Sequence, residues 1–210
     1  MNVGSLSIDD FLTRLGSSDP TPGGGALAAV AGAMAAAMLA MVCNLTLGRE
    51  RYADVETEVR SILAQCLESQ QRLIQLANED AVSYLAVRDA YRLPRGSDAE
   101  RSARADAIER AMHRATEVPV ATASAARAVL GLAARSAEIT NVSMLGDVAV
   151  AAHLALGAAR GAADQARLNL LSLADADFVS RNRAQIDDLL TGADADAARS
   201  LEAVDARASG

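Results

Sequence analysis

The 210-residue chain is acidic, with a net charge of −7, and 51% of its residues are hydrophobic although only 2% are aromatic. Because it has no basic tract, we do not expect it to bind nucleic acid. Its length suits one domain, 1–210, and its four prolines and many strong helix formers predict an all-α fold. We expect a bundle of long helices that pack closely, since the core must be built from small aliphatic side chains.

The N-terminal segment predicts a short helix followed by a glycine-rich loop. Ser7 is a typical N-cap, and Gly16 is a typical stop signal. In the segment Pro20-Thr-Pro-Gly-Gly-Gly25 the prolines delay the next helix, and the glycines leave backbone N–H groups accessible. A helix that begins near Gly25 would direct its free N–H groups at this loop, which favours a bound anion. An empty loop at a helix start is the alternative.

The segment 26–43 contains only Ala, Leu, Val, Gly, Met and Cys. The surrounding charge-free span, 20–48, is long enough to cross a membrane. Alanine makes up half of 26–43, however, and acidic rather than basic residues precede it. A helix that is apolar on all sides also suits the buried centre of a bundle. We therefore predict a central core helix that ends near Leu47, and no membrane association.

A long helix is predicted over 53–91, and Asp80 lies in the middle of its apolar stripe. The other members of the stripe are Val55, Val59, Ile62, Cys66, Leu73, Ala77 and Tyr84. A carboxylate in apolar surroundings is costly unless it is paired or used in chemistry. Two interpretations remain open: an ion pair with an arginine of a neighbouring helix, or a functional carboxylate.

The second half of the chain predicts further helices. Ser97 with Glu100 forms a capping box for a helix with a kink or break at Pro119. After a loop, Asp147 suits the N-cap of an apolar helix. Two terminal helices are expected, over the ranges 177–190 and 194–206.

The possible metal ligands are scattered, so we expect no metal site. His113 lies among charged residues and is expected on a solvated face, whereas His153 is expected in the core. Cys43 and Cys66 fall in helical patterns. Since no signal peptide is recognisable, we expect both as buried thiols of a cytoplasmic protein.

Taken together, these motifs resemble the cyclodeaminase domain of formiminotransferase-cyclodeaminase and its single-domain relatives, the bacterial methenyltetrahydrofolate cyclohydrolases. The blocks that carry the resemblance are Pro20–Gly25, Met41–Gly48, Tyr52–Val55, Asn78–Ala81, Ala90–Pro94, Glu117–Pro119, Gly146–Val148 and Arg167–Leu170. The resemblance implies an all-α, soluble homodimer with a folate site near the subunit interface. The chain departs from the family at Arg49-Glu50-Arg51, at 140–143, at Gly146 and at Asp164-Gln165, all in or near the implied site.

The reaction implied by the resemblance is the addition of water to 5,10-methenyltetrahydrofolate, which opens the ring and forms 10-formyltetrahydrofolate. This chemistry needs a carboxylate that accepts a proton from water and a group that returns one to the leaving nitrogen. It needs no metal and no cofactor beyond the tetrahydrofolate substrate. Asp80 is our candidate for the more buried acid/base, and Asp147 for the partner that positions the substrate or a proton.

The candidate substrate-binding residues are Pro22, Gly23, Gly24, Gly25, Asn44, Thr46, Arg49, Asn141 and Arg167. Asn44, Thr46 and Asn141 would supply neutral hydrogen bonds to the pterin or the one-carbon unit. The backbone of 23–25 and Arg49 would bind the carboxylates of the folate tail. Thr46 could instead bond its own helix backbone, Arg49 could be a surface charge, and Arg167 could pair with a buried aspartate.

Two other functions remain open. A formiminotetrahydrofolate cyclodeaminase would close the ring at the same site and release ammonia. A non-catalytic helical dimer would bind a folate or a protein partner.

Overall fold

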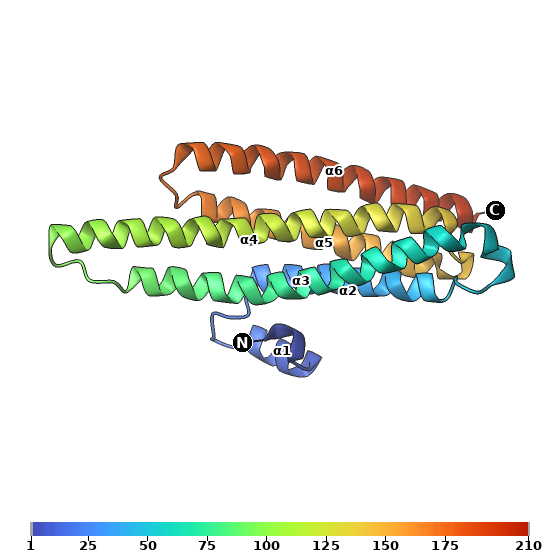
Figure 1. Ribbon diagram of the computed structural model, residues 1–210, viewed down its shortest axis with the longest axis horizontal. Coiled ribbons are helices and arrows are strands. Elements are labelled where there is room, and N and C mark those ends of the chain that lie inside the picture. The colour runs from blue at the N-terminus through green and yellow to red at the C-terminus, as the bar shows by residue number, and fades with distance from the viewer. Residues whose placement is uncertain (1, 210) are drawn as a thin grey trace.

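The computed structural model describes residues 2–209, and every regular element within them is helical. The long helices α2 (Gly24–Asn44), α3 (Glu56–Tyr91), α4 (Asp98–Ile139) and α5 (Leu145–Leu170) form an up-and-down bundle (Figure 1). α6 (Ala176–Ala208) lies along α4 and α5 on the outside of this bundle. The prediction of an all-α fold with long helices is confirmed.

The apolar helix α2 packs against α3, α4 and α5, as expected for a core helix. Small residues allow this close contact: a side chain at Gly32 would place its Cβ 3.2 Å from the methyl groups of Leu73 in α3. By length and composition two segments, Gly24–Asn44 and Val142–Leu170, could cross a membrane. The burial of α2 among three other helices explains its apolar composition without a membrane.

Several helix ends agree with the sequence. Ser7 caps α1 (Ile8–Leu15), which ends at Gly16. Ser97 and Glu100 form the predicted capping box of α4. α2 ends at Asn44, three residues before the predicted end, and a 3-10 helix (Glu50–Val55) leads into α3.

Three expectations about helix boundaries were wrong. α4 continues through Pro119 as one helix, so the break that was one of the two outcomes expected there does not occur. α5 begins at Leu145, after a 3-10 turn (Val142–Met144), so Asp147 lies in its first turn instead of at the N-cap. α6 is one helix and is not divided between 190 and 194. Gly192 lies inside it, and the guanidinium group of Arg127 from α4 occupies the place of a side chain at this position.

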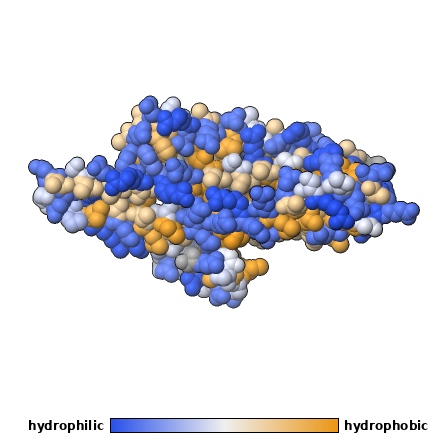
Figure 2. Space-filling view, viewed as in Figure 1, coloured by the Kyte–Doolittle hydropathy of each residue, from blue (hydrophilic) through white to orange (hydrophobic). Residues whose placement is uncertain are grey.

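The N-terminal segment stands apart from the bundle (Figure 1). A short 3-10 helix (Val3–Ser5) attaches it to α3 through a hydrogen bond of 2.6 Å from the backbone N–H of Val3 to the side-chain oxygen of Asn78. In α1, Ile8 is 75% and Leu12 57% exposed. Figure 2 shows hydrophobic residues on the surface of this segment.

Candidate functional site

A cavity of about 360 Å³ opens where the N-terminus of α2 meets α3, α4 and the C-terminal part of α5. Its lining includes Gly23, Gly24 and Gly25 and the polar side chains of Thr21, Asp80, Ser83, Gln165 and Asn169. An apolar part of the wall is formed by Tyr84, Val87 and Met112. The cavity therefore joins the glycine loop and the carboxylate that the sequence singled out separately.

The Asp80 carboxylate lies directly at the N-terminus of α2. Its Oδ2 accepts a hydrogen bond of 2.9 Å from the backbone N–H of Ala26. This is one of the N–H groups that a helix start leaves without a partner in the helix itself. A Cβ at Gly25 would lie 2.1 Å from Asp80 Oδ1, so the carboxylate can take this position only beside a glycine.

Burial raises the pKa of the Asp80 carboxyl group, and the hydrogen bond from Ala26 lowers it by a smaller amount. Within residues 2–209 no arginine or histidine forms an ion pair with this carboxylate. The chain contains no lysine at all. The interpretation of Asp80 as half of an ion pair is therefore wrong, and a half-buried carboxylate faces the cavity without a cationic partner.

The anion predicted for the start of α2 is supplied by the protein itself. Asp80 accepts the N–H group of Ala26 and lies where the positive end of the helix dipole favours a negative charge. A carboxylate from a ligand at this position would meet a like charge. The glycine backbone therefore forms a wall of the cavity, and we expect a ligand carboxylate to bind at another place.

Two amide side chains of α5, Gln165 and Asn169, form the opposite wall. They are four residues apart and therefore lie on the same face of the helix. Asn169 Nδ2 donates a hydrogen bond of 2.7 Å to the backbone carbonyl of Ala115 in α4. That carbonyl has no helical donor because Pro119, four residues later, lacks an N–H group.

This interaction accounts for the proline inside α4 and fixes the orientation of Asn169. With its NH2 group engaged by Ala115, the side-chain oxygen of Asn169 is left as an acceptor at the cavity. Gln165 lies over the glycine loop, where its Nε2 would be 3.1 Å from a Cβ at Gly24. We did not predict either amide as a site residue. Their spacing of one helical turn in an otherwise small-residue helix was the available signal.

Two of the other candidates, Thr46 and Asn141, lie at the opposite end of the bundle. Thr46 and Asn141 are 1% and 2% exposed. The Thr46 hydroxyl donates to the carbonyl of Val42 at 2.8 Å and accepts the N–H of Asn141 at 3.0 Å. Thr46 therefore bonds its own helix backbone, which was the alternative to a role in substrate binding. These two residues tie the loop after α2 to the loop before α5.

Asn44, Arg49 and Asp147 are also at this far end, where the first two are exposed and Asp147 is half-buried. Eighteen residues of α5 separate Asp147 from Gln165, which corresponds to about 27 Å along the helix. A single chain therefore does not bring Asp147 to the Asp80 cavity.

Arg167 points away from the cavity towards α6. It forms ion pairs with Asp187 at 2.7 Å and with Asp164 at 3.6 Å. Both aspartate side chains are 68% exposed, so Arg167 does not pair with a buried aspartate.

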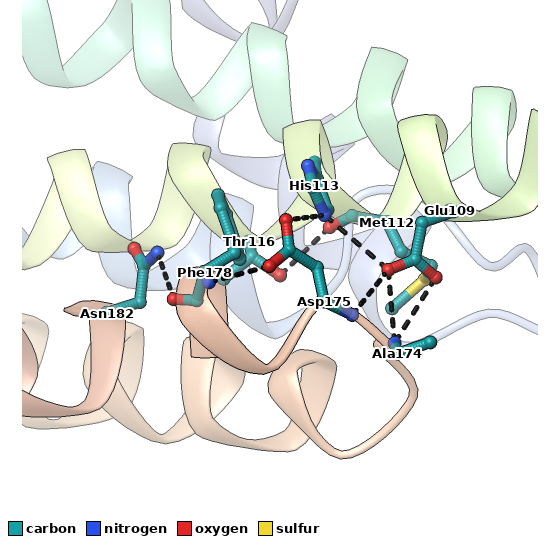
Figure 3. A network of polar contacts seen from close by, with 8 residues as sticks. All are labelled: Glu109, Met112, His113, Thr116, Ala174, Asp175, Phe178 and Asn182. Atoms are coloured by element: carbon teal, nitrogen blue, oxygen red, sulfur yellow. Dashed lines mark hydrogen bonds and ion pairs between the residues drawn. The ribbon is translucent and has the colours of Figure 1, made fainter. Parts of the chain in front are cut away.

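Both histidines differ from expectation. His113 stacks on Phe178 of α6, with ring centroids 4.1 Å apart, and its Nε2 lies between the carboxylates of Glu109 and Asp175 (Figure 3). The stacking partner from α6 is a tertiary neighbour that the local sequence could not reveal. His153 is exposed because it lies on the outer face of α5. Among residues 2–209 there is no group of three metal-ligating side chains.

The chain is similar to proteins of known families over most of its length. Residues 7–188 match the sequence model of the formiminotransferase-cyclodeaminase family. The chain is 38% identical over 193 residues to a methenyltetrahydrofolate cyclohydrolase of Methylorubrum extorquens, covering 92% of this chain and 93% of that protein.

It is 29% identical to a formimidoyltransferase-cyclodeaminase of Mus musculus over 96% of this chain but only 37% of that longer protein. Among solved structures, that of formiminotetrahydrofolate cyclodeaminase from Thermotoga maritima superposes with a TM-score of 0.88. Its sequence is 26% identical, and the match covers 97% of this chain and 98% of that one.

Proposed function

Because the chain belongs to the formiminotransferase-cyclodeaminase family, we propose that it is a methenyltetrahydrofolate cyclohydrolase, which converts 5,10-methenyltetrahydrofolate into 10-formyltetrahydrofolate. The observation that carries this proposal is the Asp80 carboxyl group, whose pKa is raised by burial at the wall of a cavity. The similarity to the Methylorubrum extorquens protein over nearly its whole length supports the choice of reaction.

Asp80 would act as the base and then as the acid. The methenyl carbon bridges N5 and N10 as a cation, so a carboxylate beside it stabilises the bound substrate. Asp80 accepts a proton from the attacking water as the new C–O bond forms. The protonated carboxyl group then gives this proton to N5 as the C–N5 bond breaks, and the hydroxyl proton leaves for solvent as the formyl C=O forms on N10. A carboxyl group with a raised pKa is suited to both transfers near neutral pH.

The two amides of α5 would orient the reactants. The side-chain oxygen of Asn169 is held at the cavity as an acceptor, and the Gln165 amide can donate or accept. A water molecule that bridges Asp80 and one of these amides would be directed at the carbon of a bound pterin.

We further propose that the active form is a homodimer built on α2. The side chains of Leu27, Met34, Met41 and Leu45 are 39–55% exposed and form an apolar stripe along this charge-free helix. The stripe extends over about 27 Å, and an exposed apolar surface of this kind is typical of an interface.

A two-fold axis across the middle of α2 would pair two such stripes in antiparallel orientation. The far end of the partner, with the residues equivalent to Arg49 and Asp147, would then lie beside the Asp80 cavity. The dimer would thereby unite the two halves of the site that one chain keeps apart. Ile8 and Leu12 of α1 offer additional apolar surface for the second copy.

The reaction itself requires no metal ion and no cofactor. Water and the three proton transfers described above suffice for it, so we propose no metal and no cofactor beyond the folate substrate. We place the enzyme in the cytoplasm and assign the activity to one domain, 1–210.

The test is the decay of methenyltetrahydrofolate absorbance in a non-nucleophilic buffer, measured against the uncatalysed rate. Asp80→Asn is expected to lower kcat by about 10²–10⁴-fold, as for the loss of an acid/base group. The matched control is Asp89→Asn, an exposed aspartate of the same helix that pairs with Arg88; its rate should stay close to wild type. Circular dichroism and thermal melting establish that both variants are folded. Full activity of Asp80→Asn would remove this residue from the mechanism.

The similarity to the Thermotoga maritima structure also supports formiminotetrahydrofolate cyclodeaminase as a second candidate. In that case a separate formiminotransferase must supply the substrate. Ammonia release from formiminotetrahydrofolate, without acceleration of methenyltetrahydrofolate hydrolysis, would favour this activity. Failure of the wild-type protein with both folates would leave the non-catalytic binding role.

A further inference from the structure

The hairpin formed by the end of α3 and the start of α4 projects beyond the other helices (Figure 1). Asp80, Tyr84 and Val87 line the cavity, and Tyr91 continues the same face of α3 one turn further. Tyr84 and Tyr91 are 43% and 49% exposed, and they are two of only three tyrosines in the chain. An aromatic surface therefore leads outward from the cavity along the hairpin.

This surface ends at Arg104, whose guanidinium group lies over the ring of Tyr91. The Cζ atom of Arg104 lies 5.5 Å from the centre of the Tyr91 ring. Its Nε and Nη2 donate to the Tyr91 carbonyl at 3.3 and 3.1 Å, which holds the side chain in place and leaves Nη1 free. Within residues 2–209 no carboxylate forms an ion pair with Arg104, whereas the neighbouring Arg101 and Arg114 pair with Asp98 and Glu79.

The charge distribution favours an anion at this place. Residues 85–114 carry seven arginines and five acidic residues, although the whole chain has a net charge of −7. The N-terminus of α2 is less suitable for a ligand carboxylate, because it already faces the carboxylate of Asp80.

We propose that the hairpin binds the p-aminobenzoylglutamate part of the folate substrate, with the benzoyl ring against Tyr84 and Val87 and the α-carboxylate of the first glutamate on Arg104. This inference rests on the proposed function, since it assumes a pterin at Asp80. Asp80 and Tyr91 are eleven residues apart, about 16 Å along α3. An elongated ligand that begins at Asp80 would reach Arg104 with its acidic end, and a pre-oriented arginine is well suited to bind a carboxylate.

The experiment compares two substrates, methenyltetrahydrofolate and methenyltetrahydropteroate, which lacks the glutamate. With the first, Arg104→Ala is expected to raise KM by about 10–100-fold, the usual effect of losing a charge-assisted hydrogen bond, while kcat changes less than about twofold. With the second, wild type and Arg104→Ala should behave alike. Arg104→Gln, which can still bond the Tyr91 carbonyl, should show the same substrate dependence and excludes a folding defect as the cause.

Arg110→Ala is the matched control, because Arg110 lies on another face of α4 and also has no acidic partner among residues 2–209. Its KM for both substrates should equal that of wild type. An equal effect of Arg104→Ala on both substrates, or no effect on either, would overturn the proposal.

A binding measurement separates this proposal from the proposed reaction. If the wild-type protein turns over neither substrate, calorimetry with 5-formyltetrahydrofolate tests the subsite directly. Weaker binding by Arg104→Ala, by about tenfold or more, would support the subsite, and unchanged affinity would refute it.

Discussion

The contact between Gly25 and Asp80 gives the most direct test of the site. In Gly25→Ala the new Cβ would lie 2.1 Å from Oδ1, 2.6 Å from Cγ and 3.0 Å from Oδ2 of Asp80. Such distances are impossible, so the carboxylate must move away. It would then lose its hydrogen bond to the N–H of Ala26. We expect the acid/base group to be displaced from the cavity while the helices remain folded.

The size of the effect follows from two opposing contributions. Loss of a hydrogen bond to a charged group costs about 1.5–3 kcal/mol. Replacement of glycine by alanine within a helix stabilises the folded state by about 0.5–1 kcal/mol. The net destabilisation of about 1–2 kcal/mol should lower Tm by roughly 2–8 °C in a chain of this size. Turnover should fall about 100-fold or more, because a displacement of about 1 Å in a catalytic group has that effect.

Gly131→Ala is the control for the backbone contribution. Gly131 lies inside α4, and a Cβ there would meet no atom within 4 Å. This variant should gain about 0.5–1 kcal/mol and keep full activity. Urea unfolding and methenyltetrahydrofolate turnover are measured on the same preparations. Wild-type turnover and an unchanged Tm in Gly25→Ala would show that Asp80 is not held against α2 as described.

Three further predictions concern titration, the proline of α4 and the dimer. Because the pKa of Asp80 is raised in the folded state, the folded protein binds this proton more tightly than the unfolded chain does. The free energy of unfolding should therefore decrease as pH rises from the ordinary aspartate range through the raised pKa. Urea unfolding at a series of pH values should show that Asp80→Asn lacks this decrease, and parallel curves for the two proteins would contradict the prediction. Pro119→Ala restores a backbone N–H group that competes with Asn169 for the carbonyl of Ala115. We expect Tm to rise while turnover falls by about tenfold, because Asn169 is no longer held in place. Unchanged turnover would show that this hydrogen bond does not orient Asn169 for the reaction. Met34→Glu places a charge on the exposed apolar stripe of α2, so this variant should be monomeric in analytical ultracentrifugation and should have reduced turnover. The control Leu171→Glu changes a 70% exposed position outside the stripe and should remain dimeric. An unaltered dimer in Met34→Glu would exclude α2 as the interface.

The success of the helix predictions has a local cause. Caps such as Ser7 and the Ser97–Glu100 box are satisfied by atoms within three residues, so they can be recognised from the sequence. The break expected at Pro119 does not occur, and the compensating contact comes from another helix, because Asn169 of α5 takes up the carbonyl of Ala115 that the proline leaves free. The division expected between 190 and 194 is also absent, because α6 continues through these residues as one helix.

The candidate site was predicted in part for the same reason. Helical periodicity placed Asp80 on a buried face, but it could not identify the group that this face meets. Thr46 and Asn141 are polar residues at helix ends, and the sequence does not reveal that their hydrogen bonds join two loops. Gln165 and Asn169 lie in segments that the sequence analysis compared with the family, but neither amide was predicted as a site residue, and Arg104 was not singled out at all.

Composition, caps and periodicity along one chain were enough to predict the helical architecture, the central position of the apolar helix and the place of Asp80 on a partly buried face. The groups that meet at the cavity could be identified from the tertiary structure alone. The hydrogen bonds from Ala26 to Asp80 and from Asn169 to Ala115 each join residues 54 positions apart. Such contacts depend on how far one helix is shifted along another, and that register is set by the interlocking of small side chains across the whole bundle.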